Sequence, residues 1–218
     1  MQVHHLLENN SIANNFISQL RDTAIQTDRM RFRRNIERLG EILGYELSKT
    51  FDFKEKEITT PLGKAKLNIP AEEVVLCSIL RAGLPLHTGL LNYFDSADNS
   101  FISAYRHHPN DDEEFEILVE YLASPSLEGK TLVLADPMLA TGRSMTLAIK
   151  AIVEQLGNPD HIHIAAVIAS EEGLEYLRAR KPSNASIWVG AVDPELNAKA
   201  YIVPGLGDAG DLAFGSKV

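Results

Sequence analysis

Hydrophobic residues in the first quarter of the chain recur at helical spacing. After Asp28 they fall on one face of a helix with 3.6 residues per turn, at Phe32, Ile36, Leu39, Leu43 and Leu47. Thr27 or Asp28 can cap the start of this helix with a side-chain oxygen. A shorter pattern capped by Ser11 predicts a preceding helix whose inward positions are Ile12, Phe16 and Leu20.

The pattern changes beyond residue 50. Alternating residues from Glu57 to Ile69, around the turn Pro61-Leu62-Gly63, predict a β-hairpin. Short apolar runs then alternate with amphipathic stretches, which predicts right-handed crossovers and a mostly parallel sheet flanked by helices. The predicted strands are 74–80, 101–105, 115–122, 131–136, 162–169 and 187–192, and the predicted helices are 84–93, 145–156 and 173–180. We expect one α/β domain, 1–218, which includes an N-terminal helical segment of about 1–50.

Charge and composition exclude several classes of protein. The net charge is −9, from 21 basic and 30 acidic residues, which disfavours binding to nucleic acid or to an anionic membrane. No apolar run reaches the length of a membrane span, and a secretory leader is not evident. With Cys77 as the one cysteine, no internal disulfide is possible. We therefore expect a cytoplasmic protein that binds a small ligand.

Three loops that follow predicted strands carry chemically useful side chains. They are Arg81-Ala82-Gly83, Arg106 after Tyr105, and the run from Asp136 to Ser144. Ligands of parallel sheets bind beyond the carboxyl ends of the strands, so these loops are expected to converge in one crevice. Arg81 offers a donor fork that matches a diphosphate, and Gly83 permits close approach of backbone N–H groups to a ligand.

The run from Asp136 to Ser144 is the most informative of the three. It comprises Asp136, Pro137, Met138, Leu139, Ala140, Thr141, Gly142, Arg143 and Ser144. Its end coincides with the start of a helix, where free N–H groups and the helix dipole favour a phosphate. It lacks the Gly-Lys-Ser/Thr ending of a P-loop, which disfavours ATP-type binding. The run predicts a ribose phosphate site, and the alternative is an ordinary turn capped by Thr141 or Ser144.

A glycine-rich stretch near the C-terminus, Gly205-Leu206-Gly207-Asp208-Ala209-Gly210, has the spacing of a dinucleotide fingerprint. That fingerprint opens the helix of a βαβ unit, and here eight residues follow Gly210, so we reject this interpretation. The stretch is better interpreted as a loop that folds over a ligand and reads a planar base with backbone groups.

Two further groups of residues leave alternatives open. Arg29, Arg31, Arg33 and Arg34 crowd a predicted helix start, either as a solvated or intersubunit face or as a site for an anion such as a nucleotide effector. His161 and His163 share one strand face but lack Cys or carboxylate partners at metal spacing, which disfavours a zinc site.

These motifs together resemble the uracil phosphoribosyltransferase family. The resemblance runs from Arg31 to Lys217 and rests on Ile79-Leu-Arg-Ala-Gly83, Tyr105-Arg106, Asp136-Pro-Met-Leu-Ala-Thr-Gly142 and Tyr201-Ile-Val-Pro-Gly-Leu-Gly-Asp-Ala-Gly-Asp211. It implies a type I phosphoribosyltransferase fold with N-terminal helices, a β-hairpin flap after Arg106 that turns at 110–112, and a C-terminal hood. The implied reaction is uracil + 5-phosphoribosyl 1-diphosphate (PRPP) → UMP + diphosphate.

The resemblance also implies a role for each site residue. Arg81 and Arg106 would hold the diphosphate of PRPP, and Asp136 would meet the ribose hydroxyls. Thr141, Gly142, Arg143 and Ser144 would bind the 5′-phosphate. Ile202, Gly207, Asp208 and Ala209 would read uracil, with Asp208 also near PRPP. The predicted catalytic set is thus Asp136, Asp208, Arg81 and Arg106, with no protein nucleophile.

The family further implies Mg²⁺ held mainly by substrate and water, a homo-oligomer built from dimers, and a GTP effector in some members. It raises the question of a cis bond between Arg81 and Ala82.

One position departs from the family: Arg143 stands where a second glycine is common, so a positive φ there would strain the loop. The alternatives are a phosphoribosyltransferase for another nucleobase and a nucleotide-binding regulator with the same fold.

Overall fold

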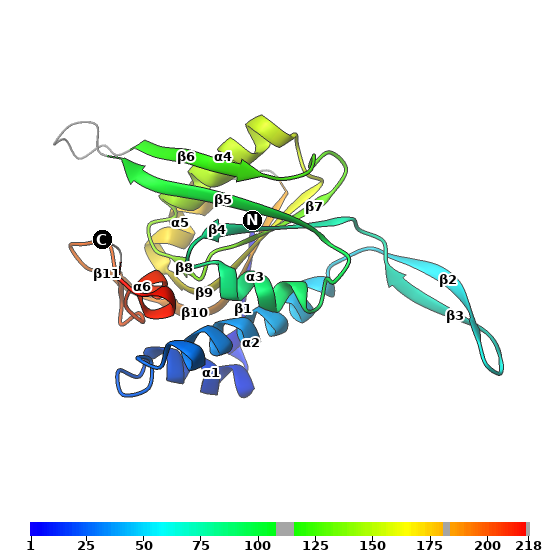
Figure 1. Ribbon diagram of the computed structural model, residues 1–218, viewed down its shortest axis with the longest axis horizontal. Helices are drawn as coiled ribbons and strands as arrows, with labels where there is room; N and C mark the ends of the chain where they lie inside the picture. Colours follow the sequence, from blue (N-terminus) through cyan, green and yellow to red (C-terminus); the bar gives the residue numbers. More distant parts are fainter. Residues whose placement is uncertain (108–115, 181–183, 217–218) are drawn as a thin grey trace.

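The computed structural model describes residues 1–107, 116–180 and 184–216 (Figure 1). Within these residues an eight-stranded sheet has the order β1-β10-β9-β7-β4-β5-β6, and β8 pairs with β9. All neighbouring strands are parallel except β5 and β6. The strands are β1 Gln2–His5, β4 Val74–Leu80, β5 Asp98–His107, β6 Glu116–Ala123, β7 Thr131–Ala135, β8 Met138–Leu139, β9 His161–Ser170 and β10 Ala185–Asp193.

Helices cover both faces of this sheet, which confirms the α/β class. The α-helices are α1 Ile12–Arg21, α2 Arg29–Ser48, α3 Leu84–Leu91, α4 Arg143–Leu156, α5 Glu171–Arg180 and α6 Ala209–Phe214, and η1 Leu6–Glu8 is a 3₁₀ turn. One buried cluster joins α1, α2, α3 and α6 to one face, and a second joins α4 and α5 to the other. The central strands are buried on both faces, as parallel strands usually are.

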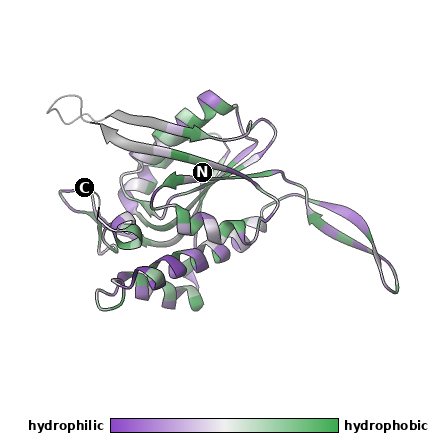
Figure 2. Ribbon diagram, viewed as in Figure 1, coloured by the Kyte–Doolittle hydropathy of each residue, from purple (hydrophilic) through white to green (hydrophobic). Residues whose placement is uncertain are grey.

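The helix predicted after Asp28 is confirmed. Asp28 caps α2 through its side chain, and all five predicted apolar positions are buried. Much of the visible surface of α2 is hydrophilic, as expected of an amphipathic helix (Figure 2). For α1 the Ser11 cap and the inward position of Leu20 are confirmed, and Phe16 is partly buried against the core. Ile12 is wrong as an inward position: it is 62% exposed, and Ala13 and Ile17 are buried instead, because they share the helix face of Leu20.

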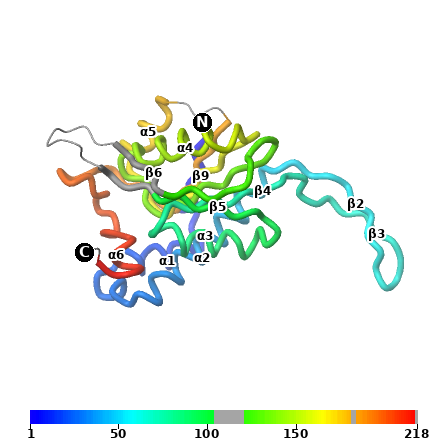
Figure 3. Tube along the Cα trace, turned by 45° about the horizontal axis from the view of Figure 1, so that its top comes forward, coloured from blue at the N-terminus to red at the C-terminus, as the bar shows by residue number. Residues whose placement is uncertain are grey.

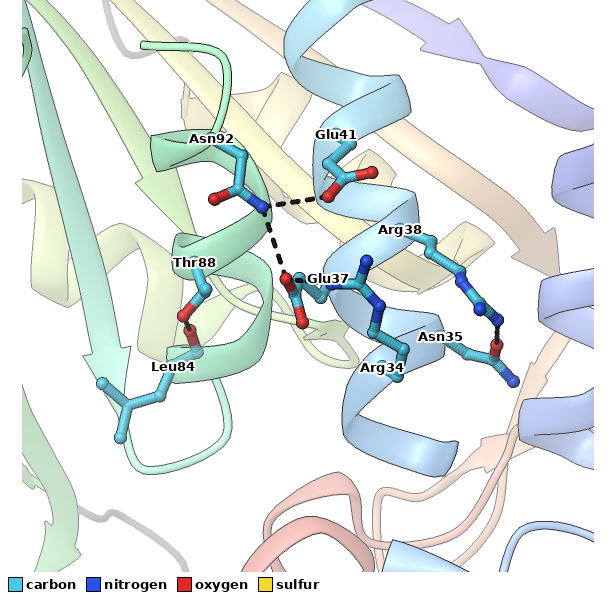
Figure 4. Close-up of polar contacts among 8 residues, drawn as sticks. All are labelled: Arg34, Asn35, Glu37, Arg38, Glu41, Leu84, Thr88 and Asn92. Atoms are coloured by element: carbon cyan, nitrogen blue, oxygen red, sulfur yellow. Dashed lines mark hydrogen bonds and ion pairs between the residues drawn. The ribbon is translucent and has the colours of Figure 1, made fainter. Parts of the chain in front are cut away.

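Helices α2 and α3 pack at very short range. A Cβ atom on Gly89 would lie 2.0 Å from the Glu37 carbonyl oxygen, and one on Gly40 would lie 2.5 Å from that of Leu86. Asn92 at the end of α3 donates to Glu41 Oε1 at 2.9 Å and to Glu37 Oε1 at 3.3 Å (Figure 4). The glycines thus allow the backbones to touch, and Asn92 fixes the register of the two helices.

The predicted hairpin is confirmed and forms an arm that projects from the body (Figures 1 and 3). It consists of β2 Phe53–Thr60 and β3 Gly63–Pro70, paired antiparallel and apart from the main sheet. Lys64 pairs with Glu57 at 2.6 Å and Lys66 with Glu55 at 2.8 Å. Leu62 at the tip is 98% exposed.

Three parts of the structure differ from the sequence prediction. The N-terminal segment contains strand β1, which extends the sheet beside β10, where we expected helices. Two very short strands, β11 Glu195–Leu196 and β12 Ile202–Val203, form a separate hairpin. The glycine-rich stretch interpreted as a loop ends in helix α6. Runs of two to six residues carry too few periods for a hydrophobic pattern to reveal them.

Strand β1 is held by aromatic contacts. His4 stacks on Trp188 with ring centroids 3.7 Å apart, and the Trp188 Nε1–H donates to His163 Nδ1 at 3.0 Å. Burial lowers the pKa of His163 to about 3, so this imidazole is a neutral acceptor at physiological pH.

No helix in the described ranges is long and apolar enough to cross a membrane. The predicted turn at 110–112 lies outside the described residues.

Candidate functional site

A cavity of about 470 Å³ opens beyond the carboxyl ends of β4 and β7. These two strands are neighbours at the centre of the sheet, and the chain leaves β4 toward β5 but places β7 on the opposite side. Such a reversal of strand order is where parallel sheets bind ligands. The lining residues are Ile79, Ala82, Asp136, Met138–Gly142, Ser144, Met145, Lys199–Tyr201 and Gly207–Gly210.

Asp136 forms the floor of this cavity directly after β7. Its Oδ1 accepts a hydrogen bond from the Met138 N–H at 3.2 Å. Burial raises the pKa of Asp136 to about 6, and the Met138 N–H offsets part of that shift. The carboxylate is therefore costly to bury in the free protein and is poised to accept hydroxyl donors or a cation.

The loop after Asp136 turns into α4 at Gly142. Gly142 has φ +71°, and a Cβ atom there would lie 2.8 Å from the Gly173 carbonyl oxygen, so only glycine fits. Arg143 is the first residue of α4 and has helical rather than positive φ. The departure at Arg143 therefore introduces no backbone strain, and its side chain is exposed outside the cavity lining.

Gly142 is the N-cap residue of α4 and has no side chain to cap the helix. Thr141 contributes a capping contact, since its Oγ1 accepts from the Arg143 N–H at 3.4 Å. Thr141 and Ser144 both line the cavity, whereas Pro137 and Arg143 do not. The start of α4 thus faces the cavity with two hydroxyls and with N–H groups that make no bond within the helix, of which that of Arg143 contacts Thr141 Oγ1.

Ser170 supports this loop from behind, and sequence reasoning missed it. Its hydroxyl donates to the Ala140 carbonyl at 2.6 Å and accepts from the Gly173 N–H at 2.9 Å. The sequence carries no signal for this role, because Ser170 lies at a strand end 30 residues from Ala140.

A turn between β11 and β12 forms a wall that the sequence did not predict. Asn197 Oδ1 accepts from the N–H groups of Lys199 at 2.9 Å and Tyr201 at 3.0 Å. Ala200, between them, has φ +60°, an unfavourable value for a residue with a Cβ atom. Asn197 thereby directs Lys199 and Tyr201 to the cavity.

The glycine-rich stretch provides the remaining wall. Gly207, Asp208, Ala209 and Gly210 all line the cavity. Asp208 also caps α6, since its Oδ1 accepts from the Asp211 N–H at 2.9 Å. Ile202 is 3% exposed and lies outside the lining, so it supports the wall from the core.

The structure does not bring Arg81 into the cavity lining. Its guanidinium lies against α6 and the residue after it, 3.4 Å from Asp211 Oδ1 and 3.1 Å from the Gly215 carbonyl oxygen. The cis bond in this loop joins Leu80 and Arg81, one residue earlier than the bond between Arg81 and Ala82 that we considered. Arg106 lies on β5 opposite Ile117, and its side chain is outside the described atoms.

The N–H of Gly83 itself donates to the Ile79 carbonyl at 3.0 Å, while the neighbouring Ala82 lines the cavity. Close approach of this loop's N–H groups to a ligand stays a prediction. A Cβ atom at Gly83 would lie 2.5 Å from Ser78 Oγ and 2.7 Å from the Ala135 carbonyl oxygen. Glycine is needed here because the loop packs against the ends of β4 and β7.

The arginines of α2 are engaged locally. Arg34 pairs with Glu37, and Arg38 donates to Asn35 Oδ1 at 3.0 Å (Figure 4). Arg33 instead donates to the Ala213 carbonyl at 2.6 Å and so links α2 to α6. These contacts account for part of the cluster, and an anion effector stays a prediction.

Among the side chains that the structure describes, Cys77 and the histidines are absent from the cavity lining. Burial raises the pKa of Cys77 to about 11, which keeps its thiol protonated and confirms it as a small core residue. Among the described residues, no group of three or more His, Cys, Asp or Glu side chains could hold a metal ion.

Comparison with known proteins agrees with this geometry. A family model described as uracil phosphoribosyltransferase matches residues 7–216. A uracil phosphoribosyltransferase from Porphyromonas gingivalis is 53% identical over 218 residues, which is all of both chains. A solved structure, the AQ2163 protein from Aquifex aeolicus, is 33% identical and superposes with a TM-score of 0.87 over all of both chains.

A more distant solved structure shares the fold alone. It is a purine phosphoribosyltransferase from Pyrococcus horikoshii, 15% identical, with a TM-score of 0.50 over 73% of this chain and 88% of that one.

Proposed function

The chain belongs to the uracil phosphoribosyltransferase family, and from that premise we propose how its cavity transfers the phosphoribosyl group of PRPP to uracil. The products are UMP and diphosphate. The observation that carries the proposal is the meeting of two segments, Asp136–Ser144 and Gly207–Gly210, in the lining of one cavity. One segment suits a ribose phosphate, and the other suits a planar base.

The phosphate site lies at the start of α4. Thr141 and Ser144 supply hydroxyl donors, and the first turn of the helix adds N–H groups that make no bond within it, of which that of Arg143 contacts Thr141 Oγ1. The helix has 14 residues, so its dipole adds to the attraction for the 5′-phosphate. Asp136, on the floor of the same cavity, accepts hydrogen bonds from the ribose hydroxyls.

The base site lies on the wall formed by Gly207, Asp208 and Ala209. Uracil alternates carbonyl and N–H groups along its edge, and backbone N–H and C=O groups can match that order. Gly207 has φ +92°, so its peptide groups take directions that other residues rarely adopt. A base read by fixed backbone groups is selected by the order of its donors and acceptors, which differs between uracil and the other nucleobases.

Charge develops on both partners when the bond to the leaving diphosphate breaks. The ribose becomes positive, and the Asp136 and Asp208 carboxylates lie in the cavity that receives it. The departing diphosphate is negative, and we assign Arg81 and Arg106 to it. For Arg81 this requires exchange of its Asp211 partner, an exposed ion pair that contributes little stability. The reaction then depends on positioning and charge, without a protein nucleophile.

Magnesium fits the oxygen donors of the cavity. Asp136 and Asp208 are the carboxylates of its described lining, and Mg²⁺ prefers oxygen ligands while it keeps several waters. We assign the ion mainly to the oxygens of PRPP and to water, with these carboxylates close by. When bound, Mg²⁺ neutralises diphosphate charge.

The test of this function compares nucleobases. Purified protein is mixed with PRPP, Mg²⁺ and each of uracil, cytosine, adenine, guanine and hypoxanthine, and diphosphate release is followed. We expect release with uracil alone. Release with another base and none with uracil would favour the alternative phosphoribosyltransferase, and no release with any base would favour a nucleotide-binding regulator.

We also propose self-association through the β2–β3 arm and a response to GTP. The arm projects from the body and exposes Phe53, Leu62 and Leu67, which a second copy of the chain can cover.

The unusual density of arginine at the start of α2 supports an anionic effector. Measurement of the turnover rate and the sedimentation coefficient with and without GTP tests the effector. An unchanged turnover rate together with an unchanged sedimentation coefficient would exclude GTP as an effector.

A further inference from the structure

A largely buried ion pair contacts the chain just before the proposed base site. The Arg21 guanidinium meets the Asp193 carboxylate with two bonds of 2.8 Å, from Nη1 to Oδ2 and from Nη2 to Oδ1. The Asp193 side chain is 7% exposed and that of Arg21 is 22% exposed. Such a two-pronged pair has a fixed geometry that a single contact lacks.

The pair also holds the backbone of Gly205 on both sides. Asp193 Oδ2 accepts from the Gly205 N–H at 3.1 Å, and Arg21 Nη1 donates to the Gly205 carbonyl at 3.1 Å. Gly205 has φ +60°, and a Cβ atom there would lie 2.0 Å from the Ile202 carbonyl oxygen. The peptide groups flanking Gly205 are therefore fixed in direction by a network whose charged members come from α1 and β10.

The residue after Gly205 is also restrained, and the chain then enters the cavity lining. The next residue, Leu206, is 3% exposed, and its carbonyl accepts from Gln26 Nε2 at 3.1 Å. Gly207, Asp208 and Ala209 follow immediately and line the cavity. Neither Arg21 nor Asp193 belongs to that lining. The two charged residues thus act on the wall of the cavity through two intervening residues.

We propose that Arg21 and Asp193 are positioning residues for recognition of the nucleobase. The inference rests on the proposed function, because it assumes that the 207–209 wall reads uracil. Backbone groups cannot adjust by a change of rotamer, so their positions must be set by what anchors the chain on either side. A small displacement of these groups would weaken base binding while leaving the phosphate site at α4 intact.

A purely structural role for the ion pair makes a different prediction. In that case a weakened pair lowers the free energy of unfolding, and the remaining folded enzyme retains its KM values for both substrates. A positioning role changes the KM for uracil selectively. The distinction therefore lies in the two KM values and in the local mobility of the 202–212 segment.

The first variant is Arg21→Lys, which keeps the charge but has a single ammonium in place of the donor fork. It can pair with Asp193 but cannot also hold the Gly205 carbonyl in the same geometry. We expect the KM for uracil to rise about tenfold, as for loss of a charged hydrogen bond, and the KM for PRPP to stay within about twofold. Asp193→Asn, which keeps an acceptor for the Gly205 N–H, should act in the same direction.

The matched control is Arg178→Lys, which alters an exposed arginine in the last turn of α5, outside the cavity lining. It should leave both KM values unchanged. Amide hydrogen exchange of the free proteins, followed by mass spectrometry, provides a second readout. Exchange should accelerate in the 202–212 segment of Arg21→Lys and stay unchanged in strand β7 and throughout the control.

The outcomes separate this inference from the proposed function. A lower melting temperature with unchanged KM values and unchanged exchange at 202–212 would overturn the positioning role while uracil turnover stands. If the wild-type protein showed no turnover with uracil, the proposed function would fail, and faster exchange at 202–212 would still support the anchoring. Absence of that faster exchange would overturn the anchoring in either case.

Discussion

Two aspartates at strand ends have different roles in this molecule. Asp136 follows β7 and lines the cavity, where burial raises its pKa to about 6. Asp193 ends β10 and is neutralised by Arg21. In the sequence both stand at the carboxyl end of an apolar run. They differ because Asp193 pairs with Arg21, 172 residues earlier in the chain, and no local pattern reveals that partner.

Asp136 should reduce the stability of the free protein at neutral pH. Its pKa is raised from 3.8 to about 6, so the buried carboxylate costs stability above pH 6, and the cost vanishes below pH 3.8, where both folded and unfolded states are protonated. Asp136→Asn should therefore raise the free energy of unfolding by up to about 3 kcal/mol at pH 8 while it lowers activity.

Urea unfolding of both proteins at pH 8 and near pH 4 measures this effect. The gain should shrink toward zero at the lower pH. A variant that is less stable than the wild type at pH 8 would show that the carboxylate is compensated by contacts other than the Met138 N–H.

Asp208 and Arg143 should differ sharply in their effect on activity. Asp208 lines the cavity and caps α6, whereas Arg143 is exposed at the first position of α4 and outside the lining. Asp208→Asn should lower kcat/KM about a hundredfold or more, and Arg143→Gly by less than about fivefold. Steady-state rates with uracil and PRPP provide the comparison, and equal losses would mean that the two segments are wrongly assigned.

At the scale of elements, the long periodic segments were predictable. The apolar stripe of α2, the hairpin β2–β3 and the buried strands β4, β7 and β9 follow from periods of 3.6 or 2 residues. Cavity segments 136–144 and 207–210 were also found, because Asp, Thr, Ser and Gly at a strand end or turn carry a chemical meaning of their own.

The remaining elements depend on distant contacts. Strand β1 forms because His4 stacks on Trp188 and β10 offers a free edge. The wall at Lys199–Tyr201 depends on the Asn197 turn, and the loop at Ala140 depends on Ser170. Tertiary partners of this kind leave no periodic trace in the sequence.

The Asn197 turn carries a strained residue. Ala200 has φ +60°, a conformation that costs roughly 1 kcal/mol for a residue with a Cβ atom and little for glycine. Ala200→Gly should therefore raise the free energy of unfolding by about 0.5–1 kcal/mol. Chemical denaturation tests this, with Ala198→Gly in the same turn as the control that should not stabilise. Destabilisation by Ala200→Gly would mean that its methyl group makes contacts that outweigh the strain.

At the scale of the whole molecule, the site and the arm lie at opposite ends (Figures 1 and 3). The cavity is formed by segments that span residues 79 to 210, so it requires the central strands and the C-terminal segment together. The β2–β3 arm contributes nothing to the described lining and pairs only with itself in the sheet topology. Its exposed apolar residues support the proposed contact with a second chain.

The arm should therefore govern self-association. Leu62→Lys combined with Leu67→Lys removes two exposed apolar side chains and should weaken the association constant by at least about tenfold. Sedimentation velocity over a range of protein concentrations measures it. Leu147→Lys, at a less exposed apolar position on α4, should leave the association state unchanged. An unaltered sedimentation profile for the arm variant would place the interface elsewhere.

The most direct test of the central claim is a crystal structure of the protein with UMP bound. The account predicts the phosphate at the start of α4, within hydrogen-bond distance of Thr141 and Ser144, and the uracil edge against the backbone of Gly207–Ala209. The ribose should lie over Asp136. Electron density for UMP outside this cavity, or with the phosphate against Gly207–Ala209, would contradict the assignment of the two walls.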